Sequence, residues 1–239
     1  MSFEREYKLR STKALETPSE LSKTRRHAVT FIVALNIIVA LILPIAFAGQ
    51  YPSHPERFGA DWGPLTLSGQ WWRLLTSQFV HIEVMHLLFN MLGLWFLGKR
   101  LEKLCGSWMF LALYLTSGLV GDVSALALHP EVASYGASTC VLGIAGAIIV
   151  MYGVDVMTLS WAARCKLAAL IAYVVYIARP ELSGGLYVGH TAGLLTGMCF
   201  ATCFKYFAKS ARSRYWTFAV VMVLLTIVGA VLRHRHRFV

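Results

Sequence analysis

The stretch YGASTCVLGIAGAIIVMY, residues 135–152, places Ser138 at the head of an apolar run. A second stretch, VGHTAG at residues 188–193, places His190 just inside the start of another apolar run. Polar side chains within the apolar segments of a membrane protein are rare, and a histidine there marks a functional position. A serine and a histidine placed in this way indicate nucleophilic chemistry inside a membrane.

The composition of the chain excludes the soluble globular class. Of its 239 residues, 57% are hydrophobic and only 14% are charged, and the mean hydropathy is positive. These values indicate an integral membrane protein that has the lipid bilayer as a partner. The net charge of +10 does not predict a nucleic-acid partner, because Lys and Arg gather in the cytoplasmic loops of membrane proteins.

Apolar runs of about 20 residues predict membrane spans. No run shows the alternation of a membrane β-barrel, so we predict helices, and with them an all-α, polytopic helical bundle. The first run lacks a small-residue cleavage site and follows a largely polar stretch of 27 residues, which favours a retained span over a signal peptide. The predicted spans are residues 28–48, 82–98, 108–128, 137–152, 158–178, 186–207 and 215–232.

The distribution of basic residues predicts the orientation. With the N-terminus inside, most of the 22 Lys and Arg residues fall in the cytoplasmic tail and loops. The second, fourth and sixth spans then all run inward from the outer face, so residues near their N-terminal ends share one depth. Ser138 and His190 lie at that depth, and so do His86 and Asn90, which are four residues apart on one helix face.

Each of these residues also has an ordinary structural explanation. A membrane serine can bond its own helix backbone, and His86 with Asn90 could simply join two helices. The coincidence of three polar clusters at one depth favours a functional site.

The residue types suit acyl transfer. A serine hydroxyl attacks an amide carbonyl when a base takes its proton, and a histidine with a pKa of about 6.5 is suited to that task. His190 would act as general base and then as acid to the leaving amine. The side chains of His86 and Asn90 and the free backbone N–H of Ser138 would stabilise the oxyanion.

Small residues recur on the two spans that carry this pair. Gly189, Gly193 and Gly197 are spaced four apart on the sixth span, and Gly136 stands just before the fourth. Such faces let helices approach closely, as a hydrogen bond between Ser138 and His190 requires. Ordinary helix packing would explain the glycines equally well.

From about Trp71 to Phe207 the chain resembles the rhomboid family of intramembrane serine proteases. The order, spacing and span placement of the family's motifs all agree. The matching residues are Trp72 and Arg73 in the first outer loop, the series His81, His86 and Asn90, Glu102 with Gly106, the Gly136-Ala137-Ser138 segment, and His190 with Gly193 and Gly197.

The resemblance implies a six-helix core with a Ser138 and His190 dyad and an oxyanion hole formed by His86, Asn90 and the Ser138 amide. It implies single-span membrane proteins as substrates, cut within or near their helix, and no cofactor or metal. Residues 49–80 would be the family's membrane-embedded outer loop, with Trp72 and Arg73 as a structural device within it. Glu102, Gly136, Gly189, Gly193 and Gly197 would serve structure and packing.

The chain departs from the family at two positions. The family commonly has glycine where this chain has Thr139, and an aromatic that packs on the histidine where it has Leu142. Neither change removes a catalytic group, so we expect an active enzyme. The alternative within the family is a weak or inactive protein that binds membrane proteins.

Other groups suggest rival interpretations. His86 and His190 could bind haem across two helices, as in a membrane cytochrome, or line a transporter site, but this leaves Asn90 and the Gly136-Ala137-Ser138 segment unexplained. Cys199 and Cys203 lack a third metal ligand. Asp122 is the carboxylate of the third span, and we interpret it as a packing or hydrogen-bonding residue rather than a third catalytic group.

The predicted organisation is a cytoplasmic tail at residues 1–27, a six-helix core at residues 28–210, and a seventh helix with a short basic tail at residues 211–239. By the resemblance, this six-plus-one plan differs from the one-plus-six plan of mitochondrial rhomboids, so we predict a bacterial plasma membrane, with a eukaryotic secretory membrane as the alternative. The active site would open to the outer side. No pattern in the sequence predicts an oligomeric state.

Overall fold

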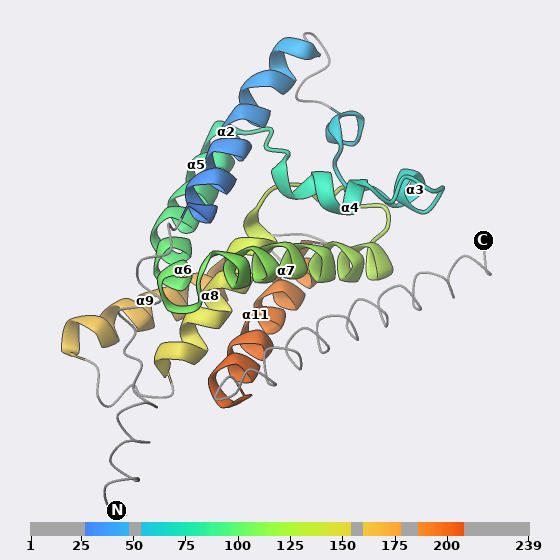
Figure 1. Cartoon of the computed structure of the whole chain (residues 1–239). Helices are drawn as coiled ribbons and strands as arrows, with labels where there is room; N and C mark the ends of the chain where they lie inside the picture. Colours follow the sequence, from blue (N-terminus) through green and yellow to red (C-terminus); the bar gives the residue numbers. More distant parts are fainter. Residues whose placement is uncertain (1–26, 48–53, 154–159, 178–185, 208–239) are drawn as a thin grey trace, which may run out of the picture.

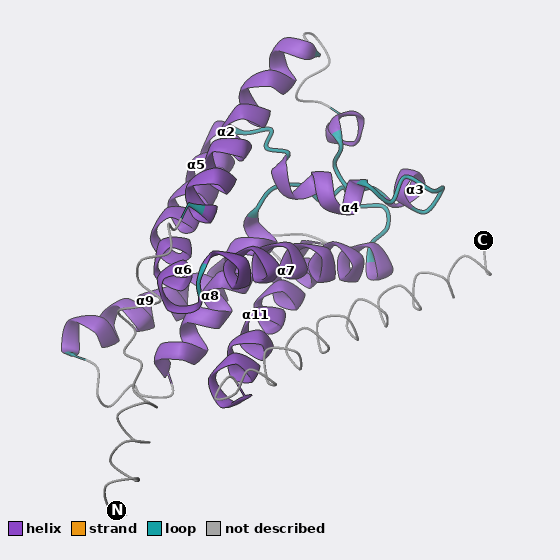
Figure 2. Cartoon of the chain, in the orientation of Figure 1, coloured by secondary structure: helices purple, strands orange, loops and turns teal. Residues whose placement is uncertain are grey.

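The computed structural model describes residues 27–47, 54–153, 160–177 and 186–207. These residues form helices and connecting loops, and no strand occurs among them (Figure 2). The predicted all-α fold is therefore confirmed. The predicted cytoplasmic tail, apart from His27, and the seventh span with its basic tail lie outside the described residues.

A helix coincides with each of the first six predicted spans (Figure 1). The described residues also form two short 3₁₀ helices, η2 (Pro55–Phe58) and η3 (Ser77–Phe79), and a π-helical segment, η4 (Leu94–Gly98). The helices are α2 (Ala28–Ala46), α3 (Gly63–Thr66), α4 (Arg73–Thr76), α5 (Val84–Gly93), α6 (Lys99–Cys105), α7 (Ser107–Leu128), α8 (Ser138–Gly153), α9 (Trp161–Ile177) and α11 (Tyr187–Phe207).

Among the described residues, two helices are long and apolar enough to cross a membrane by themselves, α2 and α7. A third candidate arises if Arg73–Phe79 and Val84–Cys105, which meet at a bend of 92°, are counted as one span. The apolar helix Ser138–Tyr152 is shorter, as the sequence predicted for the fourth span. We expect a helix this short to begin below the membrane surface, which suits a site within the membrane.

The second helical span is longer than predicted. The apolar run ends at Gly98, but the helical turns continue through η4 and α6 to Cys105. Gly106, with φ of +84°, follows the last turn. Hydropathy reports where the apolar run stops, whereas the backbone leaves the helix where a glycine adopts a left-handed conformation.

Helices α7, α8 and α11 pack against one another at the centre of the bundle (Figure 1). A Cβ atom on Gly197 of α11 would overlap the backbone of Gly143 on α8, and one on Gly143 would overlap Ser117 of α7. The predicted small-residue face of the sixth span is therefore a packing face. In lipid this close approach, rather than expulsion of water, holds helices together.

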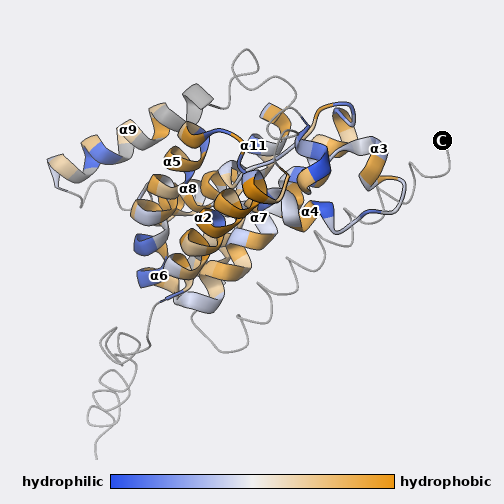
Figure 3. Ribbon diagram, turned by 90° about the horizontal axis from the view of Figure 1, so that it is seen from above, coloured by the Kyte–Doolittle hydropathy of each residue, from blue (hydrophilic) through white to orange (hydrophobic). Residues whose placement is uncertain are grey.

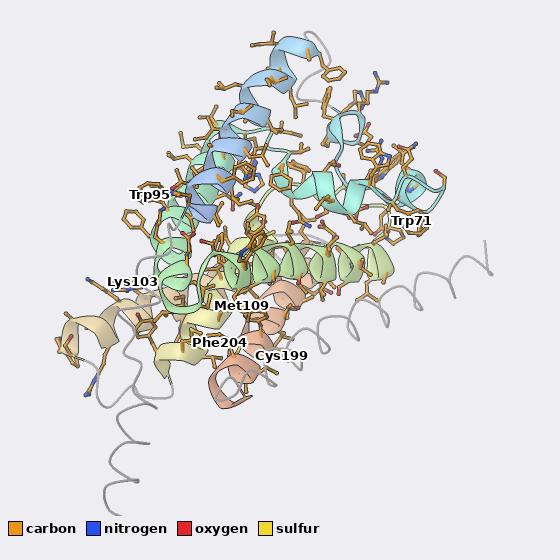
Figure 4. The ribbon with its side chains drawn as sticks, viewed as in Figure 1. Trp71, Trp95, Lys103, Met109, Cys199 and Phe204 are labelled. Carbon is orange, nitrogen blue, oxygen red and sulfur yellow. The ribbon has the colours of Figure 1, made fainter. Side chains whose placement is uncertain are left out.

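Apolar residues line both the inside and the outside of the bundle (Figure 3). On the outside, Trp95 of η4 is 47% exposed and Phe96 is 68% exposed (Figure 4), as expected of side chains that face lipid. The fully buried residues that join α2, α7, α8 and the second span include Val29, Leu94, Leu101, Phe110, Tyr114 and Ile144.

Glu102 joins the start of α2 to the turn between α6 and α7. Its Oε1 accepts hydrogen bonds from the Ala28 backbone N–H at 2.8 Å and from Ser107 Oγ at 2.7 Å. The first N–H groups of a helix have no partner within the helix, so this buried carboxylate satisfies one of them.

The long loop between α2 and α5, which the sequence predicts to be the outer loop, is folded around Arg73. The buried guanidinium donates to Gln70 Oε1 at 2.8 Å and to the carbonyl of Ala60 at 2.9 Å, and it also donates to the carbonyl of Glu56. It lies 4.6 Å from the ring centroid of Trp72. These contacts tie three parts of the loop together and leave the neighbouring Trp71 partly exposed (Figure 4).

Asp61 links this loop to the segment that precedes Ser138. Its backbone N–H and carbonyl pair with Ser134 at 2.9 and 2.8 Å, and its carboxyl accepts a hydrogen bond from Thr66. Burial raises the pKa of Asp61 from 3.8 to about 6, against the opposing effects of the Thr66 hydrogen bond and the Arg73 charge.

We expect the protein to become more stable as the pH falls from about 7 to about 5. The pKa of Asp61 is higher in the folded state than its ordinary value, so the folded state binds the proton more tightly and stability is lost as the pH rises through about 6. Full protonation of Asp61 adds up to about 3 kcal/mol to the free energy of unfolding. Asp61→Asn, which keeps an acceptor for Thr66, should unfold at a higher temperature at neutral pH and respond less to pH. The unfolding temperature in detergent, measured for both proteins across this pH range, tests the two expectations. If the native protein and Asp61→Asn responded equally to pH, Asp61 would not be the group responsible.

Candidate active site

Ser138 and His190 meet at the end of the α8–α11 contact where both helices begin. Ser138 is the first residue of α8 and His190 lies in the first turn of α11. Ser138 Oγ is 2.9 Å from His190 Nε2. A serine hydroxyl that donates to an imidazole nitrogen at this distance is within reach for proton transfer.

Glycines permit this contact. A Cβ atom on Gly193 would lie 2.7 Å from Thr139 Cγ2 and would also crowd the Thr139 carbonyl, and one on Gly189 would lie 3.2 Å from the carbonyl oxygen of Gly121 in α7. The beginning of α11 therefore lies directly against α7 at Gly121 and against the backbone of Thr139, the residue after Ser138. A side chain at Gly189 would push α11 away from α7, and one at Gly193 would push it away from α8.

His86 lies against the loop that leads to Ser138. Gly136 has φ of +99°, and a Cβ atom there would lie 2.7 Å from His86 Nε2. The ring centroid of His86 is 6.0 Å from that of Tyr135 and 5.1 Å from that of His81. Gly136 is thus required twice, once for its backbone conformation and once for the space that the histidine ring occupies.

Asn90 is buried one turn further along α5. Its Nδ2 lies 3.1 Å from His81 Nε2. The oxyanion hole predicted from His86, Asn90 and the Ser138 amide thus draws on α5 and on the start of α8, where backbone N–H groups have no partner within the helix.

His81 is a site residue that the sequence analysis used only for the resemblance. The Ala137 backbone N–H donates to His81 Nε2 at 3.2 Å. Because a backbone N–H can only donate, Nε2 must be the unprotonated nitrogen of this ring. His81 Nε2 therefore accepts hydrogen bonds from the Asn90 amide and from the backbone N–H of Ala137, the residue before Ser138. Its place nine residues before Asn90, in the same motif, was the available signal.

The structure accommodates both departures from the family pattern. Thr139 is buried, and its Cγ2 occupies space that a side chain at Gly121 or Gly193 would fill. Leu142 packs with Ala145 and against Leu97 and Leu194. The methyl of Thr139 thus has its own slot between α7 and α11, formed by glycines.

The other predicted positions lie apart from the serine and histidine. Trp72 and Arg73 belong to the outer loop and Glu102 to the end of α6, and the contacts described above give them structural roles. Cys199 and Cys203 of α11 carry free thiols, and among the described residues no three His, Cys, Asp or Glu side chains are grouped to hold a metal ion (Figure 4).

Comparison with known proteins assigns the chain to a family. A family model, the Rhomboid domain, matches residues 68–207. The rhomboid protease GluP of Bacillus subtilis is 37% identical over 117 residues, which cover 49% of this chain and 23% of that protein. The RHOMBOID-like protein 6, mitochondrial, of Arabidopsis thaliana is 35% identical over 161 residues, covering 64% of this chain and 50% of the relative.

A third relative, the rhomboid-like protease 3 of Toxoplasma gondii, is 29% identical over 183 residues, covering 72% of this chain and 66% of its own length. The chain thus spans less than two thirds of the length of each of these relatives. They come from organisms as different as a bacterium and a plant, so the similarity does not select one type of membrane. The family match covers more than half of the chain, and the chain belongs to the rhomboid family of integral membrane proteins.

Proposed function

We propose that the protein is an intramembrane serine endopeptidase that cleaves single-span membrane proteins within or near their membrane helix. Ser138 is the nucleophile and His190 the general base and acid. The observation that carries this proposal is the 2.9 Å separation of Ser138 Oγ and His190 Nε2, on two helices that glycines bring into contact.

The reaction follows from this geometry in two stages. Ser138 Oγ attacks the scissile carbonyl while its proton passes to His190 Nε2, and the carbonyl oxygen becomes negative. The C–N bond then breaks, His190 returns the proton to the leaving amine, and an acyl-serine remains. Water, activated by His190, attacks this ester and releases Ser138 and the second product as an acid.

The oxyanion needs donors that are already oriented. We assign this role to the Ser138 backbone N–H, the Asn90 amide and the His86 imidazole. In this proposal the contact of His86 with Gly136 and of Asn90 with His81 keeps both side chains beside the nucleophile. The loss of one such donor typically costs about 3 kcal/mol of transition-state stabilisation.

The haem alternative is less well supported by the same contacts. An axial ligand must direct a ring nitrogen at the iron, whereas His190 Nε2 faces Ser138 and the His86 ring lies on Gly136. A Soret band in the purified protein would overturn the protease proposal.

The proposal includes the topology and the membrane. The excess of Lys and Arg on one side puts the N-terminus in the cytoplasm and the opening of the site on the outer side. The choice of a bacterial plasma membrane, of a core at residues 28–210 and of a seventh helix rests on the sequence argument alone.

Covalent labelling tests the proposed function most directly. A fluorophosphonate probe, which reacts only with an activated serine, should label Ser138 in the reconstituted full chain and no other residue. Peptide mapping identifies the site. An unlabelled Ser138 in folded protein would instead support the inactive membrane-protein binder.

A further inference from the structure

Asp122 is a buried acidic residue near the C-terminal end of α7 that the proposed reaction does not use. It lies on α7 and is 4% exposed. Its Oδ2 accepts a hydrogen bond from Ser77 Oγ at 2.7 Å, and its Oδ1 accepts one from Ser134 Oγ at 2.8 Å. A carboxyl group buried inside a membrane protein is costly and is kept where it serves a function.

Ser134 lies in the loop of residues 134–138, which leads to Ser138 and is called the nucleophile loop, and Ser77 lies in a segment that contacts this loop. Ser77 lies in η3 of the outer loop, and its carbonyl accepts the Gly136 N–H at 2.8 Å. Ser134 precedes Gly136 by two residues and pairs with Asp61 of the outer loop through its backbone. The Asp122 carboxylate therefore holds two segments that contact Gly136: η3, through Ser77, and the start of the nucleophile loop, through Ser134.

Gly136 is the point where this anchor meets the proposed oxyanion hole. The His86 ring lies on Gly136, and Ser138 follows two residues later at the start of α8. A shift of this loop would move the serine relative to His190 and would move the Ser138 N–H relative to His86 at the same time.

The same turn of α7 also sets the distance between the two catalytic helices. Gly121, next to Asp122, leaves room for Thr139 Cγ2 of α8, and its missing Cβ would lie 2.8 Å from the carbonyl of Gly189 in α11. Residues 121 and 122 thus contact the loop, α8 and α11 together. Helix α7, with 22 residues, is a rigid element from which to position them.

We propose that Asp122 is a positioning residue, which holds the loop of residues 134–138 through Ser77 and Ser134 so that Ser138 and its backbone N–H are aligned for attack. This inference rests on the proposed function. Both carboxylate oxygens accept from loop serines, so Asp122 acts through the loop and takes no proton during the reaction.

The test compares the rate at which a fluorophosphonate labels Ser138 in variants of the full chain. Asp122→Ala should slow labelling about tenfold to a hundredfold, because small misplacements of reacting groups have effects of that size. Substrate cleavage should show the loss in kcat, with KM changed by less than about twofold. Asp122→Asn should restore most of the rate, since its amide can accept from one serine and donate to the other.

Two further measurements separate positioning from folding. Ser77→Ala and Ser134→Ala each remove one of the two hydrogen bonds, and each should slow labelling by less than Asp122→Ala, so they carry the test if Asp122→Ala does not fold. Ser124→Ala, on the same helix with a hydroxyl bonded to the Val120 carbonyl, is the matched control and should label at the native rate.

The outcomes distinguish the two proposals. Native labelling rates in folded Asp122→Ala, or in both serine variants where it does not fold, would overturn the positioning role and leave the protease proposal intact. A native chain that is not labelled at Ser138 would overturn the protease proposal itself.

Discussion

Replacement of Ser138 by alanine is expected to abolish cleavage of a co-reconstituted single-span substrate. The hydroxyl at 2.9 Å from His190 Nε2 is the proposed nucleophile, and alanine has no atom that can form the acyl intermediate. In enzymes of this type the loss of the serine lowers kcat by about six orders of magnitude. Gel-based detection of the cleaved fragment in proteoliposomes measures the effect.

The variant should remain folded, because it removes only one oxygen from the start of α8. Ser124→Ala is a suitable control, since it removes a hydroxyl from α7 that bonds its own helix backbone, and it should cleave at the native rate. Persistent cleavage by Ser138→Ala, with thermal unfolding unchanged, would rule out Ser138 as the nucleophile.

His190→Ala should likewise lose cleavage, and it should also lose fluorophosphonate labelling of a serine that is still present. Without the imidazole no base takes the proton from Ser138, so the hydroxyl is as unreactive as an ordinary alcohol. We expect a loss of at least about four orders of magnitude. Because His190 is replaced and the reactivity of Ser138 is measured, this result would show that the two residues act together.

The histidine control is His54→Ala, at an exposed position of the outer loop where the ring pairs with Glu56. It should be labelled and should cleave as the native protein does. If His190→Ala were labelled at the native rate, Ser138 would be activated by another group, and the assignment of His190 as base would be wrong.

The helices were predictable from the sequence because each one satisfies its own backbone within a continuous apolar run. The fourth span was correctly predicted to be short, and α8 begins at Ser138. The second span was predicted too short, since its last turns carry Lys99, Arg100 and Lys103, and hydropathy reads such charges as the end of a span. Charged side chains at a helix end can reach the interface while the backbone stays helical.

The residues of the candidate site could be predicted from the sequence, but the contacts that hold them in place could not. The predicted topology placed Ser138 and His190 at the same depth in the membrane. The anchoring of the nucleophile loop was not foreseen, because Asp122 and Ser77 are 45 residues apart and His81 and Ala137 are 56 apart. Hydrogen bonds over such separations leave no local pattern. The slot for Thr139 is equally invisible, since it is made by glycines on two other helices.

By itself, the sequence determined the all-α membrane fold, the positions of the helices and the polar residues at the heads of three of them. These properties are local, because they depend on hydropathy and on hydrogen bonds within one segment. Only the tertiary structure decided that Ser138 contacts His190, that Gly136 makes room for His86, and that Asp122 accepts hydrogen bonds from Ser77 and Ser134. Those contacts depend on how closely helix surfaces from distant parts of the chain can pack, and glycines set that distance.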